Sequence, residues 1–90
     1  MNDQKKIFIS LMQKEVISIL SGKASDITAF LNMEKDIPNE EIRAMYYDNL
    51  SVISEKSQKV KYQSIAISIY KKLLENTPKY EYQRKIKELS

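Results

Sequence analysis

Apolar residues recur at spacings of three and four along most of the chain, which is the pattern of amphipathic helices. Residues 49–74 show it most clearly, because they read as the end of one helix, a basic polar connector and a second helix. The second apolar stripe consists of Ile65, Ala66, Ile69, Tyr70 and Leu73. Two helices joined by a short connector should pack antiparallel, and the remaining segments are then expected to be helices that cover the open flanks of the pair.

Two helices are predicted before this pair. Residues 3–21 form the first, with Asp3 as a candidate N-cap and Gly22 at its end, where a left-handed C-cap costs glycine least. Its apolar face consists of Phe8, Leu11, Met12, Val16, Ile19 and Leu20. The second and shorter helix begins at Ser25, with Asp26 at the positive end of the helix dipole. Its inward residues are Ile27, Phe30 and Leu31.

Residues 37–39, Ile-Pro-Asn, form the sharpest break in the chain, because Pro38 disfavours a helical Ile37 and Asn39 is a good N-cap. A third helix should follow. Its inner side is expected to be Ile42, Met45, Tyr46, Leu50 and Ile53. No proline or glycine interrupts residues 39–77, so one continuous helix is an alternative. The apolar stripe lapses over residues 54–59, however, and this favours a turn near residues 57–61.

The last helices also leave an alternative open. Isoleucines alternate with other residues over positions 65–70, as they would in a strand, but strong helix formers follow and no second strand is available for pairing. Pro78 should end this fourth helix. Residues 79–90 follow as a short fifth helix or a half-docked tail, with Tyr82, Ile86 and Leu89 on one apolar side. The expected fold is all-α, an antiparallel four-helix bundle with a short C-terminal helical tail, in a single domain spanning residues 1–90.

Composition supports this fold and excludes much chemistry. The chain has 90 residues, 42% hydrophobic and 30% charged, with one glycine and two prolines, too few for the frequent turns of an all-β domain. Cysteine and histidine are absent, which excludes disulfides, zinc fingers, histidine bases and cysteine nucleophiles. The carboxylates of residues 34–41 lack the spacing of a calcium loop, and the glycine stands alone. We therefore expect no metal, no cofactor and no enzymatic activity.

Segments for export or membrane insertion are not predicted. The apolar run of residues 7–11 is interrupted by Gln13, Lys14 and Glu15 before a signal-peptide core or a membrane span is complete. A cytoplasmic location is expected, with peripheral association at the inner face of the membrane left open.

The formal net charge of +3 is unevenly distributed. Residues 1–55 carry six basic and nine acidic side chains, and residues 56–90 carry nine basic and three acidic ones. The two halves either neutralise each other within the fold or leave a cationic face for an anionic partner or membrane surface. Nucleic acid is the less favoured partner, because a reader of duplex DNA would show more arginine. The candidate partner-binding residues are Lys71, Lys72, Tyr80, Arg84, Lys85 and Lys87.

The order of segments resembles a known family. A long helix, a short helix and a break are followed by NLSVIS, the polar KSQKVKYQ and SIAISIYKKLLE, and this order resembles the small bacteriocin immunity proteins of the enterocin A type. The resemblance covers residues 5–76. Its best positions are Leu50, Ser51, Ile53, Ser54, Ile69, Tyr70 and Leu73. Gln63 is a departure, because members often have proline there, and the tail of this chain is short.

The resemblance implies a cytoplasmic four-helix bundle that protects a low-GC bacterium from its own pediocin-like bacteriocin. In that family the protein recognises the bacteriocin-occupied membrane receptor, the mannose phosphotransferase permease, from inside the cell. The C-terminal half determines which bacteriocin is countered, and in this chain that half is the basic one.

A second resemblance supports an alternative function. Ala66, Tyr70, Leu73 and Pro78 fit the second helix of a tetratricopeptide repeat, and Leu50 and Ser54 fit its first helix. Lys61 and Gln63 are departures, because the repeat has glycine and an aromatic residue there. Against it, no second copy occurs at a period of about 34 residues, and a single repeat cannot bury its own faces. The alternative is therefore a small helical adaptor or a nucleic-acid-binding regulatory protein.

Overall fold

The computed structural model of the protein describes residues 3–23 and 27–90, and it is all-helical throughout these ranges. The helices are α1 (Asp3–Leu20), α2 (Thr28–Asn32), the 3-10 helix η1 (Met33–Asp36), α3 (Glu40–Ile53), α4 (Lys56–Asn76) and α5 (Tyr80–Leu89). The predicted all-α class is confirmed, whereas the antiparallel four-helix bundle stays a prediction. The predicted helix start at Ser25 and Asp26 lies outside the described residues.

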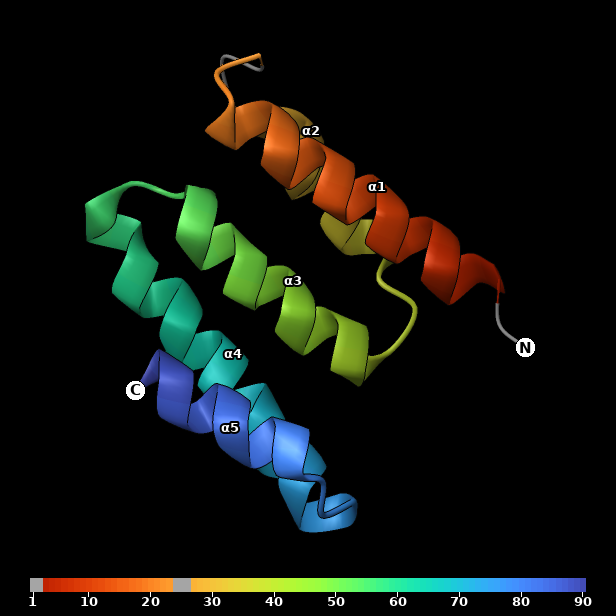
Figure 1. The fold of residues 1–90 in the computed structure, drawn as a ribbon, viewed down its shortest axis with the longest axis vertical. Coiled ribbons are helices and arrows are strands. Elements are labelled where there is room, and N and C mark those ends of the chain that lie inside the picture. Colours follow the sequence, from red (N-terminus) through yellow and green to blue (C-terminus); the bar gives the residue numbers. More distant parts are fainter. Residues whose placement is uncertain (1–2, 24–26) are drawn as a thin grey trace.

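The helices form a flat array of about 38 × 35 × 19 Å with α3 in its middle (Figure 1). On one side α3 contacts α1, which is itself in contact with α2. On the other side α3 makes the most extensive helix–helix contact of the described chain with α4, and α5 packs on α4. The long helices α1 and α4 therefore lie at opposite edges of the array.

Two separate clusters of buried residues hold this array together. The first cluster joins α1, α2 and α3 and consists of Phe8, Met12, Phe30, Ile42, Tyr46 and Leu50. The second joins α3, α4 and α5 and consists of Ala44, Ala66, Tyr70 and Tyr82. Because α3 contributes to both clusters, it is buried on two sides. The sequence analysis gave α3 one inner side and so missed Ala44 and Ser51, which are 0% and 1% exposed.

The C-terminal end of α1 and the start of α3 form as the sequence predicts, whereas Asp3, the candidate N-cap, lies inside the first turn of α1. Gly22 adopts a φ of 79°, and the amides of Gly22 and Lys23 bond back to the carbonyls of Ile19 and Ser18, which is the Schellman pattern. At the start of α3, the side chain of Asn39 accepts a 2.8 Å hydrogen bond from the amide of Ile42. These two caps fix where α1 stops and where α3 starts.

The connection between α3 and α4 differs from the prediction. The turn consists of Ser54 and Glu55, both in extended conformation, and α4 already begins at Lys56, so the predicted turn near residues 57–61 is wrong. The Ser54 hydroxyl donates to the Leu50 carbonyl at 2.6 Å and so satisfies a group at the end of α3. Residues 56–61 contain no helix breaker, so a polar first turn of α4 can form without any core contact. The predicted separation of the two helices is nevertheless confirmed.

Three leucines expected in the core are largely in solvent. Leu11, Leu20 and Leu31 are 50%, 62% and 44% exposed. The main helices that cover α1 in the described chain are α2 and α3, and their cover extends over the sector around Phe8 and Met12. The apolar face of α1 is wider than the surface available to bury it.

Candidate functional site

The six candidate residues fall into two groups on different helices. Lys71 and Lys72 lie in the second half of α4, and both are exposed. The other four lie on α5 or directly at its start, and they are Tyr80, Arg84, Lys85 and Lys87. Tyr80, Arg84 and Lys87 are exposed, whereas Lys85 is half-buried. Lys71 and Lys72 line one surface hollow, whereas Arg84 and Lys85 line another.

Most of the cations near α5 are engaged by carboxylates of the chain itself. The Lys85 ammonium lies 3.2 Å from a carboxylate oxygen of Asp48 in α3, and the Arg84 guanidinium lies 3.7 Å from Glu88. Lys79, directly before α5, lies 3.7 Å from Glu41 in α3. The pairs with Asp48 and Glu41 link α5 and the residue before it to α3, whereas the pair with Glu88 lies within α5. Together they neutralise much of the positive charge there. Lys85 therefore has a structural role whatever it does in recognition.

A tyrosine adds a further link between α5 and α3. Tyr82 is 5% exposed and its hydroxyl donates to the Glu41 carboxylate. This hydrogen bond, together with burial, raises the pKa of Tyr82 to about 12. Tyr70 of α4 lies beside it, with ring centroids 6.0 Å apart. Burial raises the pKa of Tyr70 well above its usual range, so both phenols stay protonated near neutral pH and serve packing.

The lysines on the outer side of α4 differ in their ion pairing from the cations near α5. Of the ion pairs formed among residues 3–23 and 27–90, none involves Lys61, Lys71 or Lys72. Two shallow hollows lie along this part of α4, and both are lined by Ser68 and Lys72. One of them also contains Ser64, Ile67, Lys71 and Glu75. The unpaired positive charge of the C-terminal half therefore lies mainly on α4.

The sequence analysis missed the part of this surface formed by small residues. Ser57, Lys61, Ser64, Ser68 and Lys71 are all exposed and follow one another at spacings of four, three, four and three. This spacing places them in one row along the helix. The spacing of these residues is visible in the sequence. Apolar periodicity does not reveal the row, however, because it contains only serine and lysine.

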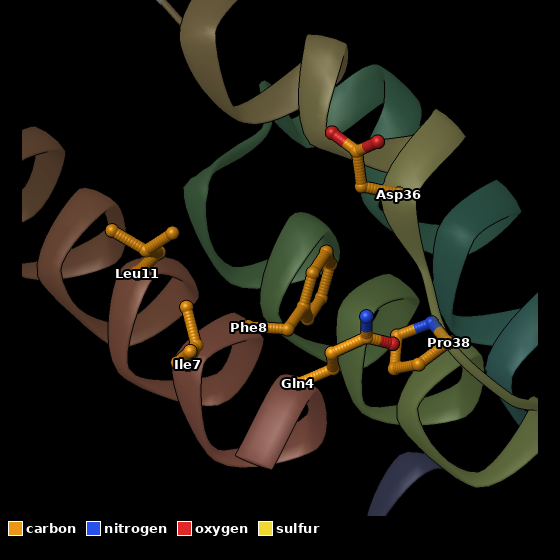
Figure 2. Close-up of a pocket in the computed structure, with 6 residues that line it drawn as sticks. All are labelled: Gln4, Ile7, Phe8, Leu11, Asp36 and Pro38. Atoms are coloured by element: carbon orange, nitrogen blue, oxygen red, sulfur yellow. The ribbon is translucent and has the colours of Figure 1, made fainter. Parts of the chain in front are cut away.

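A hollow of different character lies at the other end of the array. It opens between α1 and the segment from η1 to α3, and it is lined by Ile7, Phe8, Leu11 and Pro38, with Gln4 and Asp36 at its rim (Figure 2). The Phe8 ring points into it, while the Asp36 carboxylate stands across from α1. Its floor is apolar and it contains one carboxylate, so it offers room for an apolar side chain but no set of groups for catalysis.

Groups that would indicate catalysis or metal binding do not come together in the described chain. No three acidic side chains there are close enough to hold a metal ion. Every buried side-chain nitrogen or oxygen of the described residues has a hydrogen-bond partner, so none is left poised for a ligand. None of the described helices has the length and apolar character that crossing a bilayer requires.

Comparison with known proteins assigns no family. No protein-family model, curated protein or solved structure matches the chain. A functional conclusion must therefore rest on the surface just described and on the order of the helices.

Proposed function

We propose that the protein is a bacteriocin immunity protein. It would protect the producing cell from a pediocin-like bacteriocin by recognising the bacteriocin-occupied receptor, the mannose phosphotransferase permease, from the cytoplasmic side of the membrane. The observation that carries the proposal is the unpaired pair Lys71 and Lys72 on the outer side of α4. It lies in the half of the chain that determines specificity in the family that the sequence resembles.

The order of helices supports the same function. A long α1, a short α2 with η1, a break at Pro38 and the hairpin of α3 and α4 follow one another as the resemblance implies. In this proposal the four segments correspond to an antiparallel four-helix bundle, and α5 corresponds to its C-terminal tail. The tail is docked through Tyr82 and Lys85, so it would stabilise the surface of α4 instead of moving freely.

The proposed role is binding and not catalysis. Positive side chains that lack intramolecular partners can meet an anionic surface without first breaking an ion pair, and this favours recognition by charge complementarity. Such charges contribute little to stability, so a chain can carry them for recognition at small cost. No cofactor is part of the proposal.

Expression in a sensitive host tests the function. Cells of a bacteriocin-sensitive low-GC bacterium that produce the protein inside should survive one member of a panel of pediocin-like bacteriocins, whereas protein added outside should have no effect. The double variant Lys71→Glu/Lys72→Glu should lose protection. A matched double variant, Lys5→Glu/Lys14→Glu on α1, should keep it, because it reverses two exposed charges at the opposite edge of the array.

The melting temperatures of both variants should stay close to that of the unchanged protein. Equal killing of expressing and control cells by the whole panel would refute the immunity function. Tight, sequence-selective binding of duplex DNA at physiological salt would instead favour the regulatory alternative.

A further inference from the structure

The outer face of α4 is not apolar, as a side that packs in a core would be, and it does not mix positive and negative charges, as most solvated helix faces do. Its central row is Ser57, Lys61, Ser64, Ser68 and Lys71, all exposed. Lys72 lies beside the last of these, and no acidic residue occurs on α4 before Glu75. Solvated helices usually mix both charges, because lysines and glutamates four apart stabilise each other. Residues 57–75 contain four lysines, three of them in or beside the row, and one carboxylate, Glu75, at the far end.

The spacing of the row fits another helix. Steps of four, three, four and three are those of a helix surface that meets a second helix at a shallow crossing angle of about 20°. Serines in the middle of the row leave room for the partner's side chains, and the two hollows on this surface meet at Ser68. Ile67 in one hollow supplies apolar contact at the side. The other hollow borders α3, where Glu40 lines it together with Lys72 and with Leu73, which packs on the second core. A partner helix could therefore approach the backbone of α4 closely between the lysines.

We propose that the outer face of α4 docks an acidic helix of a protein partner. Lys61 near one end and Lys71 with Lys72 near the other lie ten and eleven residues apart, which is about 15 Å along a helix at a rise of about 1.5 Å per residue. The partner helix carries carboxylates in two groups about three turns apart and small residues between them. The proposal rests on the proposed function for the existence of a protein partner, and it adds the chemistry and the geometry of that partner.

Other anionic partners fit this face less well. A membrane-binding helix inserts large apolar side chains between lipid headgroups, whereas the centre of this row is serine and its one largely exposed apolar neighbour is Val60, 68% exposed. A single-stranded nucleic acid is bound by exposed aromatic rings next to the cations, and the row contains none. The Tyr62 ring lies 6.0 Å from the Lys61 ammonium, but it is half-buried and packs against Tyr47. Charge and shape together therefore favour a helix.

A designed peptide tests the surface directly. The probe is a labelled, alanine-rich helical peptide with two glutamate pairs eleven residues apart, and its control has the same composition with all glutamates in the centre. Fluorescence anisotropy with the full-length protein at low salt should show the matched peptide binding at least about fivefold more tightly than the control peptide. Lys61→Glu and Lys72→Glu should each remove this preference, and Ser68→Tyr should remove it without any change of charge.

The matched protein control is Lys14→Glu on α1, which changes the net charge equally and should keep the preference. Lys61→Gln serves as a second variant should charge reversal disturb folding. Equal binding of both peptides would overturn the proposal, as would binding of vesicles of phosphatidylglycerol and phosphatidylcholine that depends on Lys61 and Ser68 while the peptides do not bind.

The peptide-binding assay and the protection assay together distinguish failure of the docking face from failure of the immunity function. Peptide preference without protection in the bacteriocin assay would support the docking face and refute immunity. Protection that survives Lys61→Glu and Ser68→Tyr, with no peptide preference, would overturn the docking face and leave immunity standing.

Discussion

At the scale of single residues, Tyr46 shows how much a pattern of apolar positions can reveal. Its place in the core follows from helical spacing alone. What the spacing does not reveal is that its hydroxyl donates to the Phe30 carbonyl at 2.7 Å and that its ring stacks on Phe30 at 4.7 Å. Those contacts depend on how α2 sits against α3, and no local rule determines that placement.

Tyr46→Phe tests the hydroxyl contribution. The variant keeps the ring and removes one buried hydrogen bond, so the free energy of unfolding should fall by about 1 kcal/mol. Tyr80→Phe is the matched control and should change nothing measurable, because Tyr80 is 75% exposed. Urea denaturation with both variants gives the comparison. Equal stability of the two variants would show that the Tyr46 hydroxyl contributes nothing.

The tyrosines also predict how stability depends on pH. Burial raises the pKa of Tyr46 and Tyr70 above the usual range, burial and Glu34 raise that of Tyr47 to about 12, and Glu41 and burial raise that of Tyr82 to about 12. In the unfolded chain these phenols ionise near pH 10. Their contribution to stability is therefore complete below about pH 10 and is lost as the pH rises through about 12.

Absorbance of phenolate and helical circular dichroism, followed together against pH, check this expectation. Ionisation of these four tyrosines should coincide with loss of helix. Tyr82→Phe should make the fall of stability with pH shallower, because one group fewer titrates on unfolding. Complete ionisation of all the phenols with the helices intact would contradict it.

At the scale of elements, α5 is more firmly attached than its position at the end of the chain suggests. Its apolar side was predicted from the spacing of Tyr82, Ile86 and Leu89, and all three pack in the second core. The polar links from α5 to Asp48 and Glu41 of α3 join residues about forty positions apart and leave no trace in local sequence. The turn before α4 differs from its predicted position for a related reason. The first turn of α4 is polar, so it has no apolar periodicity from which its start could be predicted.

Lys85→Gln tests how strongly α5 is attached. It removes the ion pair with Asp48, whose side chain is 19% exposed, and should lower the free energy of unfolding by about 1 kcal/mol. Lys87→Gln removes an exposed charge from the same helix and should cost far less. If the free energy of unfolding falls with denaturant concentration at the same slope in both variants, the difference between them is a difference in stability. If the two variants are equally stable, the ion pair makes no net contribution.

At the scale of the whole molecule, the described chain is organised around α3, which is shared by two cores. The sequence predicted the helices, their order and most buried residues, because each stripe is local. It did not reveal that α3 has two buried sides. Ala44 and Ser51 are small and one is polar, so neither stands out in an apolar pattern, although their spacing of seven places them on one side of the helix.

Native-state hydrogen exchange can test this organisation. Amides of α3 should exchange most slowly, since opening α3 disrupts both cores, whereas α1 and α5 each take part in one core. Phe30→Ala in the first core and Tyr70→Ala in the second should both speed exchange throughout α3. Slowest exchange in α1, or two separate thermal transitions, would show that the cores fold independently.

The small residues on the second side of α3 also affect what the chain exposes during its synthesis. The ribosome releases α1, α2 and α3 before α4. The three helices of the first core therefore emerge while the second side of α3 is not yet covered by α4. The side that waits presents Ala44 and Ser51, with the ring of Tyr47 between them. The small neighbours limit the apolar area that a nascent chain exposes at this stage, and α4 then closes over Ala44 and Tyr47.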